Sequence, residues 1–265
     1  MMIREKLKSK NKIVIKIGSS SLTHESTGQL NLSRLEKFIR EITNLKNMGK
    51  DVILVTSGAI AVGTKTMNLS ERPTSIEEKQ AVAAVGQANL MMIYQKIFSE
   101  YNQKVGQILI TKDVMDNPVR RQNAQNTINI LLKMGAIPIV NENDTVATEE
   151  IVYGDNDTLS AIVGKLVTAD LLILLSDING LYNEDPRINN NAELISEVLK
   201  ITNKIERMAG GAGSVNGTGG MCTKISAAKI ATANGMDMII ANANIENIIE
   251  KIISGYEVGT LFLSN

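Results

Sequence analysis

The stretch KIVIKIGSS, residues 12–20, decides how the rest of this chain is interpreted. Its apolar, β-branched part predicts a strand with both faces buried, and the glycine and serines that follow predict a turn. Lys16 interrupts the apolar run, where a solvated lysine is not expected unless the strand lies at a sheet edge. The stretch therefore favours a buried strand that ends in a functional lysine.

Short apolar runs and segments of helical period alternate along the rest of the chain. Strands are expected at residues 12–17, 51–56, 105–110, 137–140, 171–176, 236–241 and 260–263. Helices are expected at residues 32–48, 75–100, 120–134, 157–168, 221–234 and 245–253. Ser33 with Glu36, and Ser75 with Glu78, have the spacing of capping boxes at two of the helix starts.

Buried strands joined by helices predict βαβ units around a mostly parallel sheet. Because such crossovers are right-handed, helices should cover both faces, which gives an α/β protein with a three-layer αβα sandwich. No linker or internal repeat divides the chain, and residues 181–203 form its least regular region. A single domain is therefore expected.

The composition excludes several classes of protein. The 28 basic and 28 acidic residues balance, which gives no indication of a nucleic-acid partner. One cysteine excludes an internal disulfide framework and suits a reducing cytoplasm, and one histidine excludes histidine-rich metal sites. The basic N-terminus lacks the apolar region of a secretory signal, and no apolar run is long enough to cross a membrane.

The expected carboxyl ends of the strands are where ligands bind in open α/β sheets. The segments there are small, polar and rich in glycine: GSS (18–20), TSGAIAVG (56–63), NENDTV (141–146) and SDINGLYNEDPR (176–187). YGDNDTLSA (153–161) and GTGGMCTK (217–224) lead into helices, whose N-termini offer free N–H groups to an anion. Lys16 and Lys224 would add the positive charge that the transfer of a phosphoryl group requires.

Each of these features also has an ordinary structural interpretation. A glycine cluster is more often a surface loop than a phosphate cradle, and a lysine at a helix start is usually solvated. Asp144, Asp155, Asp157 and Asp177 can serve as helix caps or turn residues. Thr223 stands where a P-loop requires glycine, and no dinucleotide fingerprint follows the first strand. The joint placement of these aspartates after predicted strands favours the functional interpretation.

Six motifs together carry a resemblance to a known family. VIKIGSSSLT (14–23), LVTSGAIAVG (54–63), NENDTV (141–146), GDNDTLSA (154–161), SDINGLYNEDPR (176–187) and GTGGMCTK (217–224) resemble, in this order, the glutamate 5-kinases of the amino acid kinase family. The resemblance covers essentially the whole chain. It implies one domain over residues 1–265 with about eight strands, and ATP-dependent phosphorylation of the γ-carboxylate of L-glutamate to L-glutamyl 5-phosphate, the first step of proline biosynthesis.

The resemblance also assigns roles to residues. It implies that Lys16 and Lys224 neutralise the transferring phosphoryl group, with Asp157 orienting both lysines. It implies a glutamate site formed by Ser57, Asp144 and Asn156. It implies a nucleotide site formed by Lys16, Ser176, Asp177, Thr218, Gly219, Gly220, Met221, Cys222, Thr223 and Lys224. Mg²⁺ is expected on ATP oxygens, with no protein side chain as ligand.

Two departures from the family pattern are visible. Ser176 stands where the family usually has threonine, which keeps the hydroxyl group. The C-terminal PUA domain of many members, a fold associated with RNA binding, is not expected here, and no matched motif depends on it. The resemblance further implies a cytoplasmic homo-oligomer, dimer or tetramer, with possible feedback inhibition by proline and without nucleic-acid or membrane partners.

Three alternatives stay open. A related kinase could use another acceptor, such as N-acetylglutamate, aspartate or carbamate, although TSGAIAVG and NEND favour glutamate. A sensor on the same fold could bind an amino acid or nucleotide without catalysis, although it would need neither Lys16 nor Lys224. An NAD-dependent oxidoreductase is disfavoured by the missing fingerprint.

Overall fold

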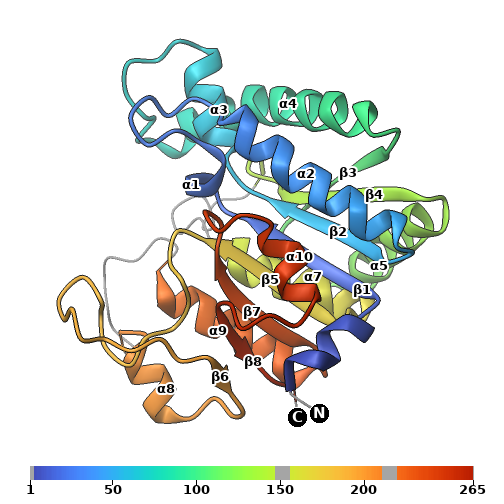
Figure 1. Ribbon diagram of the computed structural model, residues 1–265. Helices are drawn as coiled ribbons and strands as arrows, with labels where there is room; N and C mark the ends of the chain where they lie inside the picture. The colour runs from blue at the N-terminus through green and yellow to red at the C-terminus, as the bar shows by residue number, and fades with distance from the viewer. Residues whose placement is uncertain (1–2, 147–155, 211–219, 265) are drawn as a thin grey trace.

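The computed structural model describes residues 3–146, 156–210 and 220–264 (Figure 1). Its strands are β1 Lys12–Ile17, β2 Asp51–Thr56, β3 Lys104–Ile110, β4 Ala136–Glu142, β5 Leu171–Ser176, β6 Glu197–Val198, β7 Asp237–Asn242 and β8 Thr260–Phe262. Its α-helices are α1 Ser19–Leu22, α2 Leu32–Asn47, α3 Ala59–Thr66, α4 Ile76–Glu100, α5 Pro118–Lys133, α7 Asn156–Val167, α8 Asn203–Met208, α9 Met221–Ala233 and α10 Ile248–Ile253. Two 3₁₀ helices are η1 Ile3–Ser9 and η2 Lys112–Met115.

The strands form one eight-stranded sheet in the order β3-β4-β2-β1-β5-β7-β8-β6. β1 lies near the centre and pairs in parallel with β2 and β5, so that Ile13 lies opposite both Val52 and Leu171. Within the described sheet, β8 runs antiparallel to β7 and the other neighbouring pairs are parallel. The predicted α/β class with a mostly parallel sheet is confirmed.

Helices cover both faces of the sheet, as the alternation along β1 shows (Figure 1). Ile13, Ile15 and Ile17 join the core beneath α2, α4 and α10. Val14 joins the opposite core, which contains buried residues of α5, α7 and α9. Because side chains alternate along a strand, Lys16 lies on the same face as Val14, toward α7. The alternation of side chains along β1 thus places Lys16 on the sheet face covered by α7, the helix that contains Asp157.

Helix starts agree with the sequence prediction at α4 and disagree at α2. Ser75 Oγ accepts a hydrogen bond from Glu78 N at 3.2 Å, as the first half of a capping box requires. The predicted capping box of Ser33 and Glu36 is wrong: Asn31 caps α2 by accepting from Arg34 N at 3.0 Å. Asparagine is among the strongest N-caps, so the helix begins two residues earlier than a Ser33 cap would allow.

Two glycines let α3, which the sequence did not predict, lie directly against α4. A Cβ at Gly86 would lie 1.8 Å from Ala59 O, and a Cβ at Gly63 would lie 2.0 Å from Val82 O. No side chain fits at either position, so the backbones of the two helices are in contact. This seam fixes the turn before α3 relative to the middle of α4, where Gln87 lies.

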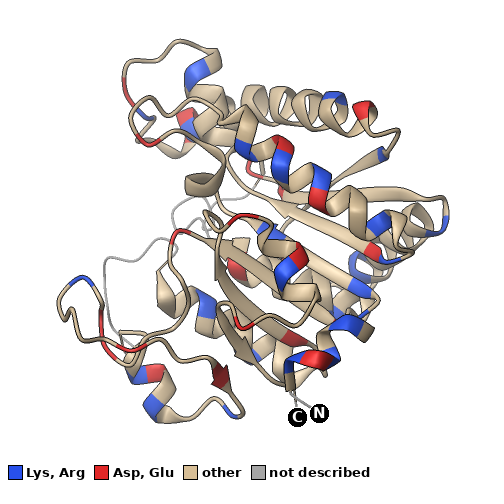
Figure 2. Cartoon of the chain, viewed as in Figure 1, with Lys and Arg blue, Asp and Glu red and all other residues tan. Residues whose placement is uncertain are grey.

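Basic and acidic residues are interspersed over the helices and loops seen in Figure 2, which agrees with the balanced composition. In the part of the chain that the structure describes, no helix combines the length and the apolar character needed to cross a membrane.

Candidate active site

Lys16, Asp157 and Lys224 meet at the carboxyl edge of the sheet. Lys16 comes from the end of β1, Asp157 from the first turn of α7, and Lys224 from the first turn of α9. Lys16 Nζ lies 2.7 Å from Asp157 Oδ1, and Lys224 Nζ lies 3.0 Å from Asp157 Oδ2. The three side chains are only 11%, 2% and 6% exposed, respectively. The fold therefore buries two ammonium groups around one carboxylate.

The charges of this cluster do not cancel. Burial raises the pKa of the Asp157 carboxyl, but the ammonium groups of Lys16 and Lys224 outweigh burial and hold that pKa below its ordinary value. Thr223 Oγ1 also donates to Asp157 Oδ2 at 2.9 Å. An ionised carboxylate between two ammonium groups leaves a net positive charge, which suits an anionic ligand.

Glycine N-caps begin three helices at this edge. They are Gly18 for α1, Gly58 for α3 and Gly220 for α9, and none of the three helices has a side-chain capping bond from the described residues. Gly58 has φ +103°, a left-handed conformation that favours glycine. A Cβ at Gly18 would lie 3.4 Å from Lys16 Nζ, an ordinary van der Waals contact, so this turn lies directly beside the ammonium group. Helix starts of this kind leave backbone N–H groups for an anion.

Two of the predicted glutamate-binding residues, Ser57 and Asn156, lie in direct contact. Asn156 Nδ2 donates to Ser57 Oγ at 2.9 Å, to the Thr56 carbonyl at 2.6 Å and to Asn141 Oδ1 at 2.8 Å. Asn156 directly precedes Asp157 in α7, so this group of amides and hydroxyls adjoins the charged cluster.

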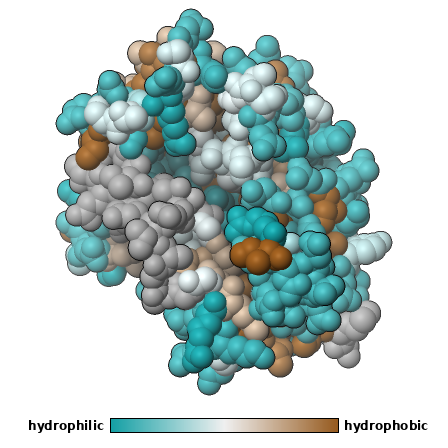
Figure 3. All heavy atoms as spheres, turned by 90° about the vertical axis from the view of Figure 1, so that its left-hand side faces the viewer, coloured by the Kyte–Doolittle hydropathy of each residue, from teal (hydrophilic) through white to brown (hydrophobic). Residues whose placement is uncertain are grey.

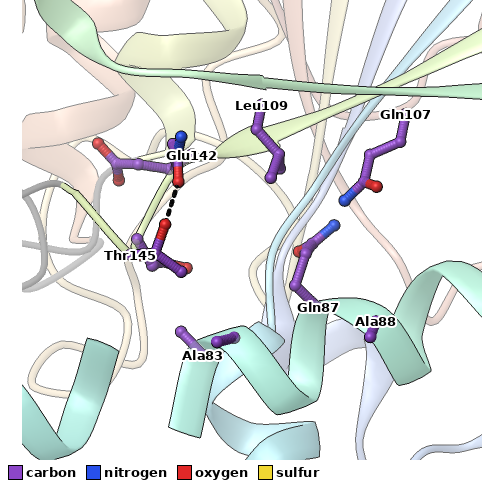
Figure 4. Close-up of a pocket in the computed structure, with 10 residues that line it drawn as sticks. Ala83, Gln87, Ala88, Gln107, Leu109, Glu142 and Thr145 are labelled. Carbon is purple, nitrogen blue, oxygen red and sulfur yellow. Dashed lines mark hydrogen bonds between the residues drawn. The ribbon is translucent and has the colours of Figure 1, made fainter. Parts of the chain in front are cut away.

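The third predicted glutamate residue, Asp144, lines a pocket of about 260 Å³. The pocket lies between α4, β3 and the segment that follows β4 (Figure 4). Gln87 enters it from α4, and Gln87 Oε1 accepts a hydrogen bond from Asn141 Nδ2 at 2.8 Å. Asn141 thereby connects the pocket of Asp144 with the contacts of Ser57 and Asn156.

The predicted nucleotide residues lie beside the lysines where the structure describes them. Ser176 and Asp177 follow β5, the neighbour of β1, and Ser176 Oγ donates to Asp177 Oδ1 at 3.0 Å. Gly220 and residues 221–224 form the start of α9, which packs against α7. Thr218 and Gly219 lie outside the described residues. Figure 3 shows the side of the molecule on which these loops lie, with a mostly hydrophilic surface and scattered hydrophobic residues.

The sequence motifs assign no role to Gln87 or Asn141. Asn141 belongs to the NENDTV motif, and its place directly after the predicted strand 137–140 was a usable signal. Gln87 lies in the helix segment AVAAVGQAN (81–89), and a lone long amide among small residues was the corresponding signal. The spacing of residues along the sequence could not predict the contact between Gln87 and Asn141, because the two lie on separate elements, α4 and β4.

Comparison with known proteins places this geometry in a family. Residues 11–242 match the model of the amino acid kinase family. A glutamate 5-kinase of Clostridium perfringens is 52% identical over 99% of this chain and 98% of its own length. The glutamate 5-kinase of Clostridium tetani is 56% identical over 98% of this chain and 97% of its own length.

Solved structures agree on the fold. A UMP kinase from Bacillus anthracis superposes with a TM-score of 0.64 at 16% identity and covers 97% of both chains. A UMP kinase from Ureaplasma parvum gives a TM-score of 0.66 at 14% identity, with 96% of this chain and 99% of that chain covered. At 14% and 16% identity the likeness shows the fold alone. The glutamate 5-kinases, at 52% and 56% identity, also identify the subfamily. This chain belongs to the amino acid kinase family and, within it, to the glutamate 5-kinases.

Proposed function

We propose that this chain transfers the γ-phosphoryl group of ATP to the γ-carboxylate of L-glutamate and forms L-glutamyl 5-phosphate, the first step of proline biosynthesis. The observation that carries the proposal is the convergence of Lys16 and Lys224 on Asp157. Relatives that match nearly the full chain at 52% and 56% identity are glutamate 5-kinases and support the same reaction.

The reaction explains why the site contains lysines and no histidine. The side-chain carboxyl of glutamate has a pKa of about 4.3, so the acceptor is already ionised at neutral pH and needs no general base. The barrier comes from bringing this carboxylate to a polyanionic phosphate. Positive charges held in place before the reaction lower that barrier, because they meet the negative charge where it develops.

In this proposal Lys16 and Lys224 contact the phosphoryl group during transfer. Asp157 is a positioning residue that keeps both ammonium groups at the same point and stays ionised. The attacking glutamate oxygen forms the new bond to phosphorus as the bond to the bridging oxygen of ADP breaks. The attacking oxygen supplies the electron pair of the new bond, and the pair of the broken bond leaves with the bridging oxygen of ADP. The acceptor carries no proton, so the step balances without a proton acceptor.

The two substrates occupy different parts of the sheet edge in this proposal. Ser57, Asn156 and Asp144 bind glutamate, because they join the polar group around Asn141 with the pocket beside α4. Ser176, Asp177 and the start of α9 bind ATP on the other side of β1. The lysines lie between these two groups, where the phosphoryl group has to cross.

Mg²⁺ belongs to the nucleotide in this proposal. Both oxygens of Asp157 already contact ammonium groups, so this carboxylate is poorly suited to hold a second cation. Mg²⁺ gives up its water ligands reluctantly and is commonly carried by phosphate oxygens, where it would neutralise charge on ATP. The lysines of this chain would then act on the oxygens that Mg²⁺ leaves uncovered.

The remaining expectations also stay part of the proposal. We expect a single amino acid kinase domain over residues 1–265, a homo-oligomer, a cytoplasmic location and feedback inhibition by proline. Size-exclusion chromatography with light scattering tests the assembly, and titration of the reaction with proline tests the inhibition.

A direct test supplies the purified protein with ATP, Mg²⁺, L-glutamate and hydroxylamine, and measures glutamyl hydroxamate. Hydroxamate formation that depends on both ATP and glutamate is the expected result. Parallel reactions with N-acetyl-L-glutamate, aspartate and carbamate test the related kinases. Product from N-acetyl-L-glutamate and none from glutamate would overturn the substrate assignment, and nucleotide binding without any product would favour the sensor.

A further inference from the structure

A row of three amide side chains links α4 to the start of α7. Gln87 Oε1 accepts from Asn141 Nδ2 at 2.8 Å, and Asn141 Oδ1 accepts from Asn156 Nδ2 at 2.8 Å. All three side chains are buried, with Gln87 only 8% and Asn156 only 7% exposed. The row therefore connects the pocket of Asp144 with the residue that precedes Asp157.

Backbone groups fix the direction of every amide in this row. The Thr56 carbonyl can only accept, so the group of Asn156 that faces it at 2.6 Å is the NH₂. The Glu142 amide can only donate, so the atom of Asn141 that faces it at 2.9 Å is the oxygen. The NH₂ of Asn141 must then point toward Gln87, and the side-chain oxygen of Gln87 accepts its hydrogen bond. No amide in the row can turn over without breaking a hydrogen bond to its neighbour.

The fixed direction has a consequence for the ligand. The Asn156 amide makes its hydrogen bonds through its NH₂ group, and among the described residues its carbonyl oxygen has no hydrogen-bond donor. Asn156 is thus left with an acceptor to offer a ligand. An acceptor suits an ammonium group, which has three N–H bonds and a positive charge, better than the single, uncharged N–H of an acylated amine.

Gln87 buries a polar group at a position where a small apolar side chain would avoid a loss of stability. Its Nε2 is buried without an acceptor among the described residues, and an unsatisfied buried donor destabilises a protein. The pocket wall around it is otherwise built from small residues of α4, as Figure 4 shows for Ala83 and Ala88. The hydrogen bond from Asn141 to Gln87 Oε1 is the contact that requires a long amide at this position.

We propose that Gln87 is a positioning residue that, through Asn141, holds the carbonyl oxygen of Asn156 toward the amino-acid substrate and so selects a free ammonium group over an acylated amine. This inference rests on the proposed function, because it assigns the substrate selectivity of that same site. Gln87 itself does not touch the phosphoryl group or the lysines.

The test compares variants of Gln87 in the full-length protein. Gln87→Met keeps the length and removes the acceptor, and Gln87→Asn keeps the chemistry and is one methylene too short. Both should raise the KM for glutamate roughly five- to tenfold, the usual effect of one lost buried hydrogen bond. The ratio of the Ki of N-acetyl-L-glutamate, measured as a competitive inhibitor, to the KM of glutamate should fall by a similar factor.

Controls separate positioning from a general structural role. Gln87→Glu keeps an oxygen acceptor for Asn141 and should retain the wild-type ratio of Ki to KM. Asn89→Leu changes an amide of the same helix outside the pocket and the row, where Asn89 Nδ2 donates to Thr66 Oγ1 at 2.8 Å, and should leave both constants unchanged. The KM for ATP and kcat should stay within roughly twofold in every variant, since the lysines are untouched.

The outcomes distinguish the two proposals. A wild-type protein without glutamyl hydroxamate formation would overturn the proposed function. An active wild type with an unchanged ratio of Ki to KM in either Gln87→Met or Gln87→Asn would overturn the role of Gln87 alone, and one folded variant of the two suffices. A ratio lowered equally by Asn89→Leu would also overturn it, because the effect would then belong to helix α4 as a whole.

Discussion

Asp157 and Glu41 are both buried carboxylates beside helix N-termini, and their surroundings shift their pKa values in opposite directions. Asp157 contacts two ammonium groups, which hold its pKa below the ordinary value against the effect of burial. Glu41 extends from α2 to the start of α10, where its Oε2 accepts from Ile249 N at 2.8 Å and Glu250 N at 3.1 Å. Burial raises the pKa of Glu41, and these two N–H groups offset only part of that effect.

The two carboxylates serve different purposes. Burial acts on both groups in the same direction, so the neighbours decide the sign of the pKa shift. Glu41 joins two helices and serves the fold. Asp157 stays charged between two ammonium groups, and the net positive charge of these three side chains suits the binding of an anion.

The largest expected effect follows from removal of an ammonium group beside Asp157. Lys224→Ala should lower kcat roughly a thousandfold, because a preorganised charge is lost where the phosphoryl group carries negative charge in the transition state. The KM for glutamate should change much less, as steady-state hydroxamate assays would show. Lys229→Ala is the matched control on the same helix, since Lys229 pairs at the surface with Glu206 at 2.8 Å. Near-normal turnover in Lys224→Ala would contradict the assigned role.

The next effect concerns stability. Asp157→Asn leaves two buried ammonium groups without a carboxylate and should lower the free energy of unfolding by about 3 kcal/mol. The pKa of Asp157 is lowered in the folded state, so its stabilising contribution is present above the unfolded pKa and is lost as pH falls through the folded pKa. Urea unfolding should therefore show the largest difference from wild type at neutral pH, shrinking below about pH 4.

Glu206→Gln provides the comparison for that measurement. Its partner Lys229 and the carboxylate itself are 48% and 41% exposed, so solvent screens the pair. The variant should change the free energy of unfolding by less than about 0.5 kcal/mol. Equal losses in Asp157→Asn and Glu206→Gln would remove the distinction between the buried cluster and an ordinary surface pair.

The smallest effect is expected at Glu41. Its folded pKa is raised, so its contribution to stability is present below the unfolded pKa of about 4.3 and is lost as pH rises through the folded pKa. Glu41→Gln keeps a carbonyl oxygen for Ile249 and Glu250 and does not titrate. Its melting temperature should therefore rise relative to that of wild type between pH 4 and pH 7, with kcat unchanged. If the melting temperature of Glu41→Gln instead falls relative to that of wild type between pH 4 and pH 7, the folded protein stabilises Glu41 as the carboxylate.

The comparison between sequence and structure differs from element to element. β1, β2 and β5 have the bounds that the sequence predicts, because an uninterrupted apolar run is buried on both faces of a parallel sheet. α3 was missed, since its pattern of small residues has no amphipathic period and depends on the contact with α4. The cap at Asn31 was missed because Ser33 and Glu36 have the spacing of a capping box that begins two residues after the actual cap.

For the candidate site, the polar segments around the strand ends and helix starts pointed to Lys16, Asp157 and Lys224, and the family resemblance implied roles for Ser57 and Asn156. The structure brings these residues together in two adjoining groups. Their catalytic and binding roles stay predictions until the assays above are done. Gln87 was not predicted, because a glutamine in a helix has no motif of its own. Its partner Asn141 is distant in sequence, and only the seam at Gly63 and Gly86 sets the position of α4 that allows the contact.

Periodicity and turn residues act locally along the chain, so the sequence alone predicted most strands and long helices and the polar segments at strand ends. The shared carboxylate of Asp157 between lysines from β1 and α9, and the row of amides from Gln87 to Asn156, emerge only in the folded chain. The order of strands within the sheet and the packing of the helices are not encoded in local patterns, and they determine which distant charges and amides are buried together.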